Sequence, residues 1–184
     1  TAPLLILLLV SVMSLLALKD SSTALSNLNQ STERIHKTNE VKRAVQDDFL
    51  TTLNTIKSGS IKPALGLTRL TNNRKKFTPV WNDFITSIEP QNAGQVAEFK
   101  AGKAHLDKGL DELMGILSNK DADIDVAKEF NIATRYYIFA DANASGAPLD
   151  VITEMGDRLL TSLNQRIEGN QKNNQAVFKE SKDN

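Results

Sequence analysis

The stretch that decides the fold is "QVAEFKAGKAHLDKGLDELMGIL", residues 95–117. Its large apolar side chains recur at seven-residue intervals, and the positions between them are mostly charged or small. Two such rows on one side are typical of a helix that packs against other helices. The stretch therefore predicts a helix with a bundle seam. The first row is Phe99, Leu106 and Leu113; the second is Val96, Leu110 and Leu117, with Lys103 at its remaining position.

Two further helices are predicted before this stretch and a fourth helix after it. Residues 19–57 contain neither proline nor glycine, and their apolar residues from Val41 to Ile56 recur at spacings of three and four. "SGS" at 58–60 ends that helix, and a second helix starts near Ile61. Pro79 predicts a kink in it near Phe77 and Thr78, and "EPQNAG" at 89–94 closes it.

The fourth helix follows a polar turn, "SNKDAD" at 118–123, which offers Asp121 or Asp123 as a helix cap. "NASGAP" at 143–148 then interrupts the helical pattern. If this stretch is a kink, the fourth helix and the last helix run in the same direction. If it is a hairpin turn, the last helix runs antiparallel to the fourth. We favour the kink, because residues 141–145 suit a helix while Gly146 and Pro148 bend it. The prediction is an all-α protein, an antiparallel four-helix up-down bundle.

Composition narrows the function. The chain has 184 residues, with 22 basic and 22 acidic side chains, so its net charge of zero gives no indication of nucleic-acid binding. It has no cysteine, which excludes disulfides, thiolate catalysis and cysteine-based metal sites. Aromatic residues make up only 5% of the chain, which suits long helices better than a β-sandwich. One domain besides the N-terminal stretch is expected.

The chain begins "TAPLLILLLVSVMSLLALKD", in which residues 4–18 are apolar apart from Ser11 and Ser14. An amphipathic surface helix would interrupt its apolar residues at every second or third position, so this run indicates a membrane-spanning helix. The alternative is a secretory signal peptide, but "LLALKDSSTA" lacks a clear small-x-small cleavage site. We expect a truncated transmembrane anchor at 1–18 and a helical ligand-binding domain at 19–184.

An apolar anchor followed by a long bundle of four helices with short turns resembles the extracytoplasmic sensor domain of bacterial methyl-accepting chemotaxis receptors and of related sensor histidine kinases. The stretch "LLALKDSSTALSNLNQSTERIHKTNEVKRAVQDDFLTTLNTI" carries most of this likeness. The resemblance implies a dimeric chemoreceptor domain in the periplasm, attached to the bacterial inner membrane, that binds a small solute and passes a helix shift across the membrane in signal transduction.

Receptors that resemble this chain hold small anions with arginines from neighbouring helices. Arg69 lies eight residues after Ile61 and Arg135 eleven after Ile124, so both fall about 12–16 Å below the distal turns. Arg74 points about 140° away from Arg69 but would reach the same site across a dimer seam. Arginine suits carboxylates, so we expect a small organic anion as ligand. The candidate ligand-binding residues are Arg69, Asn73, Arg74, Thr134, Arg135, Tyr136 and Tyr137; each can equally be a surface or packing residue.

Other chemistry is not indicated. Glu33 and His36 have the Glu-x-x-His spacing of di-iron bundles, but no second such motif exists, and His105 has Ala101 where its partner would stand. Neither histidine lies in a nucleophile elbow or triad pattern, and no glycine-rich phosphate loop occurs. We therefore expect no enzyme, no metal and no cofactor. The rival interpretation is a helical stalk or adaptor that binds another protein; a sensor needs the cluster around Arg69 and Arg135 buried, and a stalk leaves it in solvent.

Overall fold

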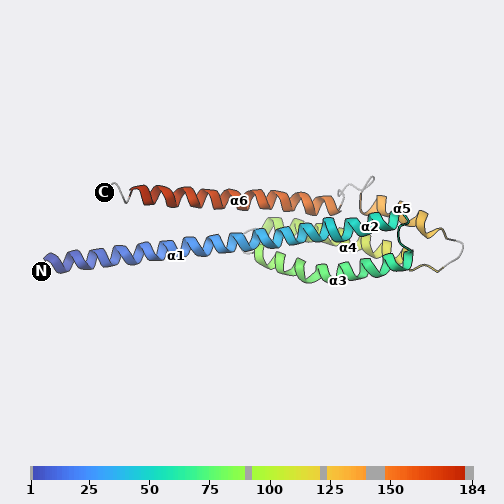
Figure 1. Ribbon diagram of the computed structural model, residues 1–184, viewed down its shortest axis with the longest axis horizontal. Helices are drawn as coiled ribbons and strands as arrows, with labels where there is room; N and C mark the ends of the chain where they lie inside the picture. The colour runs from blue at the N-terminus through green and yellow to red at the C-terminus, as the bar shows by residue number, and fades with distance from the viewer. Residues whose placement is uncertain (1, 90–92, 121–123, 140–147, 181–184) are drawn as a thin grey trace. The chain divides into compact units, whose positions relative to one another are not determined.

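The computed structural model describes residues 2–89, 93–120, 124–139 and 148–180, with side chains from Ser11 onward except at 174 and 177–180. In these residues the chain is all-helical and contains no strand, which confirms the predicted all-α class (Figure 1). The elements are α1 (Ala2–Arg43), the π-helix η1 (Ala44–Leu50), α2 (Thr51–Lys57), α3 (Pro63–Ile88), α4 (Ala93–Leu117), α5 (Val126–Tyr137) and α6 (Pro148–Glu180).

The chain divides into two compact units, which are described separately. One unit comprises Thr1–Ile35 and Ser162–Asn184 and contains the outer parts of α1 and α6. Ser31, Arg34 and Leu163 are its buried residues, whereas the leucines of α1 between Leu15 and Leu25 are exposed. The other unit, His36–Thr161, holds all the remaining helices and is called the core unit below. The domain boundary predicted between residues 18 and 19 stays a prediction.

The N-terminal apolar run does not give a membrane span. Among the described residues, no helix combines the length and the apolarity that a membrane crossing requires. The run from Leu4 to Leu18 rises about 22 Å at 1.5 Å per residue, and the hydrocarbon core is about 30 Å thick. The predicted localisation, in the bacterial inner membrane with the sensor domain in the periplasm, is therefore wrong.

The core unit contains a π-helical segment, η1, that was not predicted from the sequence. Val41, Val45, Phe49 and Leu53 are all buried and stand four residues apart. On an α-helix each four-residue step overshoots a full turn by about 40°, so such a stripe would drift away from the core. A π-helix takes more residues per turn, because its hydrogen bonds span five residues instead of four. η1 therefore keeps the stripe facing the core.

α3 runs back along α2 after a short turn. Gly59 in this turn has φ of 70°, the left-handed region that glycine adopts without strain. Pro63 opens α3 at its first turn, where its missing N–H is not needed. α3 continues through Pro79 to Ile88, and the kink predicted near Phe77 and Thr78 stays a prediction.

Aromatic side chains of α3 form the centre of the core. Phe77 meets Phe49 of η1 at 5.4 Å between ring centroids, and Phe84 meets Phe99 of α4 at 4.9 Å, both edge to face. Trp81 lies between Phe77 and Phe84 and is 4% exposed. Edge-to-face pairs stabilise a core beyond the area they bury.

α4 and α5 complete the core unit. The predicted seam of α4 is buried at Val96, Phe99, Leu106, Leu110, Leu113 and Leu117. Asp125 caps α5 by accepting a hydrogen bond from the backbone N–H of Lys128 at 3.1 Å. The caps predicted at Asp121 and Asp123, and the kink or turn predicted at 143–147, lie outside the described residues.

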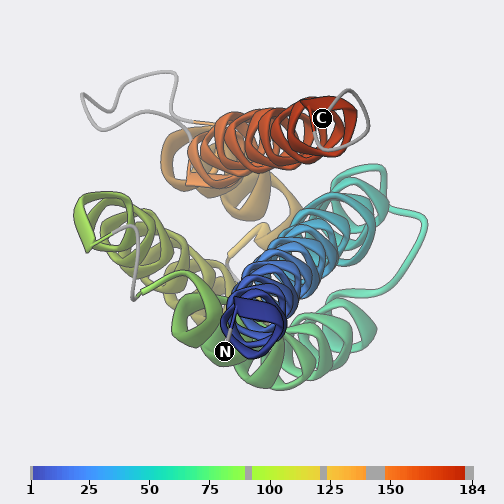
Figure 2. The same ribbon diagram turned by 90° about the vertical axis from the view of Figure 1, so that its left-hand side faces the viewer.

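Four helices of the core unit each pack on two of the others. α2 packs on α3, α3 on α4, α4 on α5, and α5 on α2 (Figure 2). α3 and α5 are not among the pairs in extensive contact. The two helices that carry Arg69 and Arg135 therefore do not pack extensively on each other.

Candidate functional site

Arg74 forms ion pairs with carboxylates of its own chain. Its guanidinium forms an ion pair with Asp111 of α4, and its Nε lies 3.6 Å from an Asp107 carboxylate oxygen. The hydrogen bond to Asp111 raises the pKa of Arg74 above its ordinary value, and Asp107 adds to the effect, although partial burial opposes it. Lys103 shares Asp107 at 2.5 Å. This predicted ligand-binding arginine therefore joins α3 to α4.

Asn73 is also used within the fold. Its side-chain amide donates to the backbone carbonyl of Asp48 at 2.8 Å and to Thr52 Oγ1 at 2.9 Å. Asp48 belongs to η1 and Thr52 to the first turn of α2. Asn73 thus links α3 to the point where the π-helix passes into α2.

The predicted residues of α5 lie on different faces of that helix. Thr134 is fully buried, and its hydroxyl donates to the Phe130 carbonyl at 2.7 Å. Tyr136 is exposed and Tyr137 is half-buried, with their rings 4.8 Å apart and perpendicular. The structure therefore gives these three residues packing contacts within α5 and does not bring them to one site.

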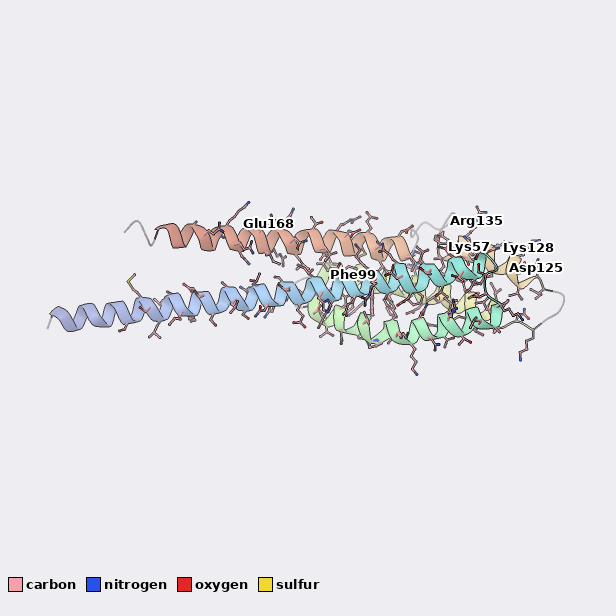
Figure 3. All side chains as sticks on the ribbon, viewed as in Figure 1. Lys57, Phe99, Asp125, Lys128, Arg135 and Glu168 are labelled. Carbon is pink, nitrogen blue, oxygen red and sulfur yellow. The ribbon has the colours of Figure 1, made fainter. Side chains whose placement is uncertain are left out.

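Arg69 and Arg135 are both exposed, and the structure does not bring them together. Arg69 projects from α3 and Arg135 from α5, which do not pack extensively on each other. In the view of Figure 3, Arg135 is labelled toward the same end of the core unit as Lys57, Asp125 and Lys128. The shared height computed from the sequence is thus not accompanied by a shared face.

A groove lies between α4 and the first turns of α6. Its volume is about 310 Å³, which lies at the lower end of the range for small-molecule sites. α4 contributes Glu98, Ala101, Gly102 and His105, and α6 contributes Pro148, Val151, Glu154, Met155 and Arg158. One wall is apolar and the rim is charged, as is usual for a site that orients a small solute.

The charged groups of the groove interact with one another. Arg158 pairs with Glu154 one turn earlier on α6. The hydrogen bond to Glu154 raises the pKa of Arg158, and the charge of Glu98 on α4 makes a smaller contribution in the same direction. Glu98 and Arg158 both line the groove. Two carboxylates and one guanidinium leave the groove with a formal charge of −1 when His105 is neutral.

A smaller hollow of about 40 Å³ adjoins the groove. Gln95, Glu98, Phe99, Met155 and Arg158 line it. Gln95 Oε1 is buried and accepts no hydrogen bond. Buried polar atoms are nearly always paired in folded proteins, so this acceptor marks a place where a donor group is favoured.

The opposite side of the same α6 segment packs closely on α1. A Cβ at Gly156 would lie 3.1 Å from Lys42 Cγ and 3.8 Å from the Thr38 methyl carbon. Lys42 also forms an ion pair with Asp157. Residues 148–161 therefore contact the groove on one side and the end of α1 on the other.

The groove is not predicted from the sequence. There His105 is a candidate only as a metal ligand, and Glu98 and Arg158 have no expected role. The available signals were small residues, Ala101 and Gly102, on a helix with a clear seam, and a Glu-x-x-x-Arg pair on α6. Both patterns are common on helix surfaces and become informative only when they face each other.

Comparisons with known proteins do not assign a family to the chain. No protein-family model matches it, and no curated protein and no solved structure shows significant similarity to it.

Proposed function

We propose that the chain is a non-enzymatic sensor module, an antiparallel four-helix bundle that binds a small solute and responds by shifting α6 against α1. The observation that carries the proposal is the position of residues 148–161. Val151, Glu154, Met155 and Arg158 line the groove, while Gly156 and Asp157 of the same turns contact α1.

The mechanism follows from this two-sided contact. A solute in the groove changes the position that α6 prefers only if it binds one position more tightly than another. Close packing at Gly156 means that a displacement of α6 is felt by Lys42 and Thr38, because tightly packed interfaces have discrete arrangements. α1 and α6 both continue out of the core unit as unbroken helices, so they are suited to carry the shift onward.

The expectations of a carboxylate ligand and of a homodimer both stay predictions. The guanidinium groups that suggested a carboxylate are exposed at Arg69 and Arg135 and paired at Arg74. These positions supply less support for an anion than the sequence indicated. Sedimentation velocity at several protein concentrations tests the dimer directly.

A second candidate function is the protein-binding stalk or adaptor. It is favoured by the exposure of Arg69 and Arg135, which was the feature expected to separate the two functions. Ile132 and Tyr136 are also about half exposed on the outer face of α5. A stalk requires no solute in the groove and no coupled movement of α6.

The proposed function is tested by combining binding with a distance measurement. The full chain is screened by thermal shift against acetate, succinate, glutamate, n-butylamine and phosphate; a ligand at 100 times its dissociation constant stabilises a fold by about 2.7 kcal/mol. The absence of cysteine allows spin labels at Asn39→Cys and Thr161→Cys, which are exposed positions on α1 and α6.

We expect a stabilising solute to change the distance between these labels. Labels at Asn72→Cys and Glu112→Cys, on α3 and α4, are the matched control and should not move. If a solute stabilises the chain without changing the α1–α6 distance, the chain binds a solute but does not shift α6 in response, and the sensor proposal fails. A screen in which no solute stabilises a well-folded chain would favour the stalk.

A further inference from the structure

The chemistry of the α4–α6 groove favours a cation over an anion. With His105 neutral, its charged groups are Glu98, Glu154 and Arg158, so its formal charge is −1. The one guanidinium is already bound to Glu154, and the charge of Glu98 also acts on it. A carboxylate ligand would have to compete with both glutamates for Arg158 and would bring a second negative charge beside them.

The unpaired acceptor points in the same direction. Gln95 Oε1 is buried and accepts no hydrogen bond from another group of the chain, and Gln95 and Glu98 both line the small hollow beside the groove. An ammonium group has three N–H donors and no acceptor, so it can satisfy an amide oxygen and a carboxylate together. A carboxylate group has no donor to give to Gln95 Oε1.

The remaining wall suits a hydrocarbon chain. Ala101 and Gly102 of α4 and Val151 and Met155 of α6 present apolar surface next to the acidic end. A volume of about 310 Å³ corresponds to roughly ten water volumes. This is room for a short aliphatic chain with one or two polar ends.

We propose that the α4–α6 groove binds a primary aliphatic amine, with its ammonium group between Gln95 Oε1 and the Glu98 carboxylate and its chain against Val151 and Met155. The inference rests on the proposed function, for which it names the ligand class and the site. It replaces the carboxylate expected from Arg69 and Arg135 with a ligand of opposite charge.

The test uses three ligands of one chain length: n-butylamine, butyrate and n-butanol. Titration calorimetry on the full chain should show binding of n-butylamine and none of the other two. Glu98→Gln should weaken amine binding at least tenfold and Gln95→Leu several-fold. Glu112→Gln, the same substitution at an exposed position on the same helix away from the groove, should leave the affinity unchanged.

A second measurement needs no variant in the binding step. Methyl-labelled methionine gives three signals, from Met13, Met114 and Met155. n-Butylamine should shift the Met155 signal, assigned with Met155→Leu, and leave Met114 unchanged. This readout holds even if a groove variant is poorly folded.

The outcomes separate the two proposals. If another solute of the screen stabilises the chain while n-butylamine neither binds nor shifts Met155, the amine inference is overturned and the sensor proposal survives. Amine binding that is insensitive to Glu98→Gln and leaves Met155 unshifted places the ligand elsewhere and also overturns the inference. If no solute binds at all, both proposals fail together.

Discussion

Replacing Asn73 with alanine tests whether the π-helix is held by contacts from α3. The side-chain amide of Asn73 makes two hydrogen bonds, one to the Asp48 carbonyl in η1 and one to Thr52 Oγ1. Each contributes about 1 kcal/mol net, so their loss costs about 2 kcal/mol. The Asp48 carbonyl still accepts from the backbone N–H of Thr51, so it is not left without a partner. Alanine also gains roughly 0.5 kcal/mol of helix propensity, which leaves a net loss of about 1.5 kcal/mol.

Asn72→Ala is the matched control. Asn72 is the preceding residue of α3 and is exposed, so its replacement brings the same propensity gain without the loss of these bonds. The two variants should therefore differ by about 2 kcal/mol in free energy of unfolding. For a chain of this length that is a difference of about 4–8 °C in melting temperature.

The measurement is urea unfolding followed by tryptophan fluorescence. Trp81 is the only tryptophan in the sequence and is buried in the core unit, so its emission reports on the part of the fold that contains η1. The midpoint should fall for Asn73→Ala and rise slightly for Asn72→Ala, with the slope unchanged for both. Free energies of unfolding that agree within about 0.5 kcal/mol for the two variants would refute the view that Asn73 stabilises the π-helical register.

Three further substitutions test the core, a helix cap and a helix contact. Phe99→Ala should cost about 3–5 kcal/mol, because Phe99 is fully buried against the aromatic cluster, and should alter Trp81 emission; unchanged emission would contradict the packing. Asp125→Ala should cost about 1 kcal/mol by urea unfolding, whereas Asp125→Ser keeps the cap and should cost much less. Gly66→Ala places a Cβ 2.7 Å from a buried isoleucine of α2 and should destabilise the fold by about 1–3 kcal/mol, while Gly115→Ala, with open space around it, should melt at or above the wild-type temperature.

The helices could be predicted because their signals are local. The two rows of α4 place a residue at the core every seven positions, and all six apolar members are buried as expected. The breaks at Gly59 and Pro63 depend on backbone conformations that only a few residue types favour. Each of these features is decided within a few residues of the chain, so the sequence contains the necessary information.

The π-helix has a sequence signal, the four-residue spacing of its apolar residues, but this spacing was interpreted as α-helical. Val41, Val45, Phe49 and Leu53 are spaced by four at every step, and the α-helical interpretation accepted them as one face. Three successive steps of four drift by about 120° on an α-helix, which is too far for one narrow face. A strict spacing of four was therefore evidence for a local increase in residues per turn.

The candidate site could not be predicted in the same way, because a site depends on which helices are neighbours. Position along a helix follows from counting residues, and on that basis Arg69 and Arg135 fall at similar heights. Their angular positions around the bundle depend on helix order, and α3 and α5 are not extensively packed partners. Arg74 shows the same effect, since its partners Asp107 and Asp111 lie on the next helix and leave little positive charge for a ligand.

The groove reverses the electrostatic argument made from arginines alone. A guanidinium attracts an anion only where its own chain does not supply one, and Arg158 has Glu154 and Glu98 beside it. What the groove leaves unmatched is one negative charge and the buried oxygen of Gln95. Both require a donor, and both lie against the α6 segment whose other side contacts Lys42. A ligand that binds these two groups therefore also contacts the α6 segment that packs on α1, so its binding can alter the contact between α6 and α1.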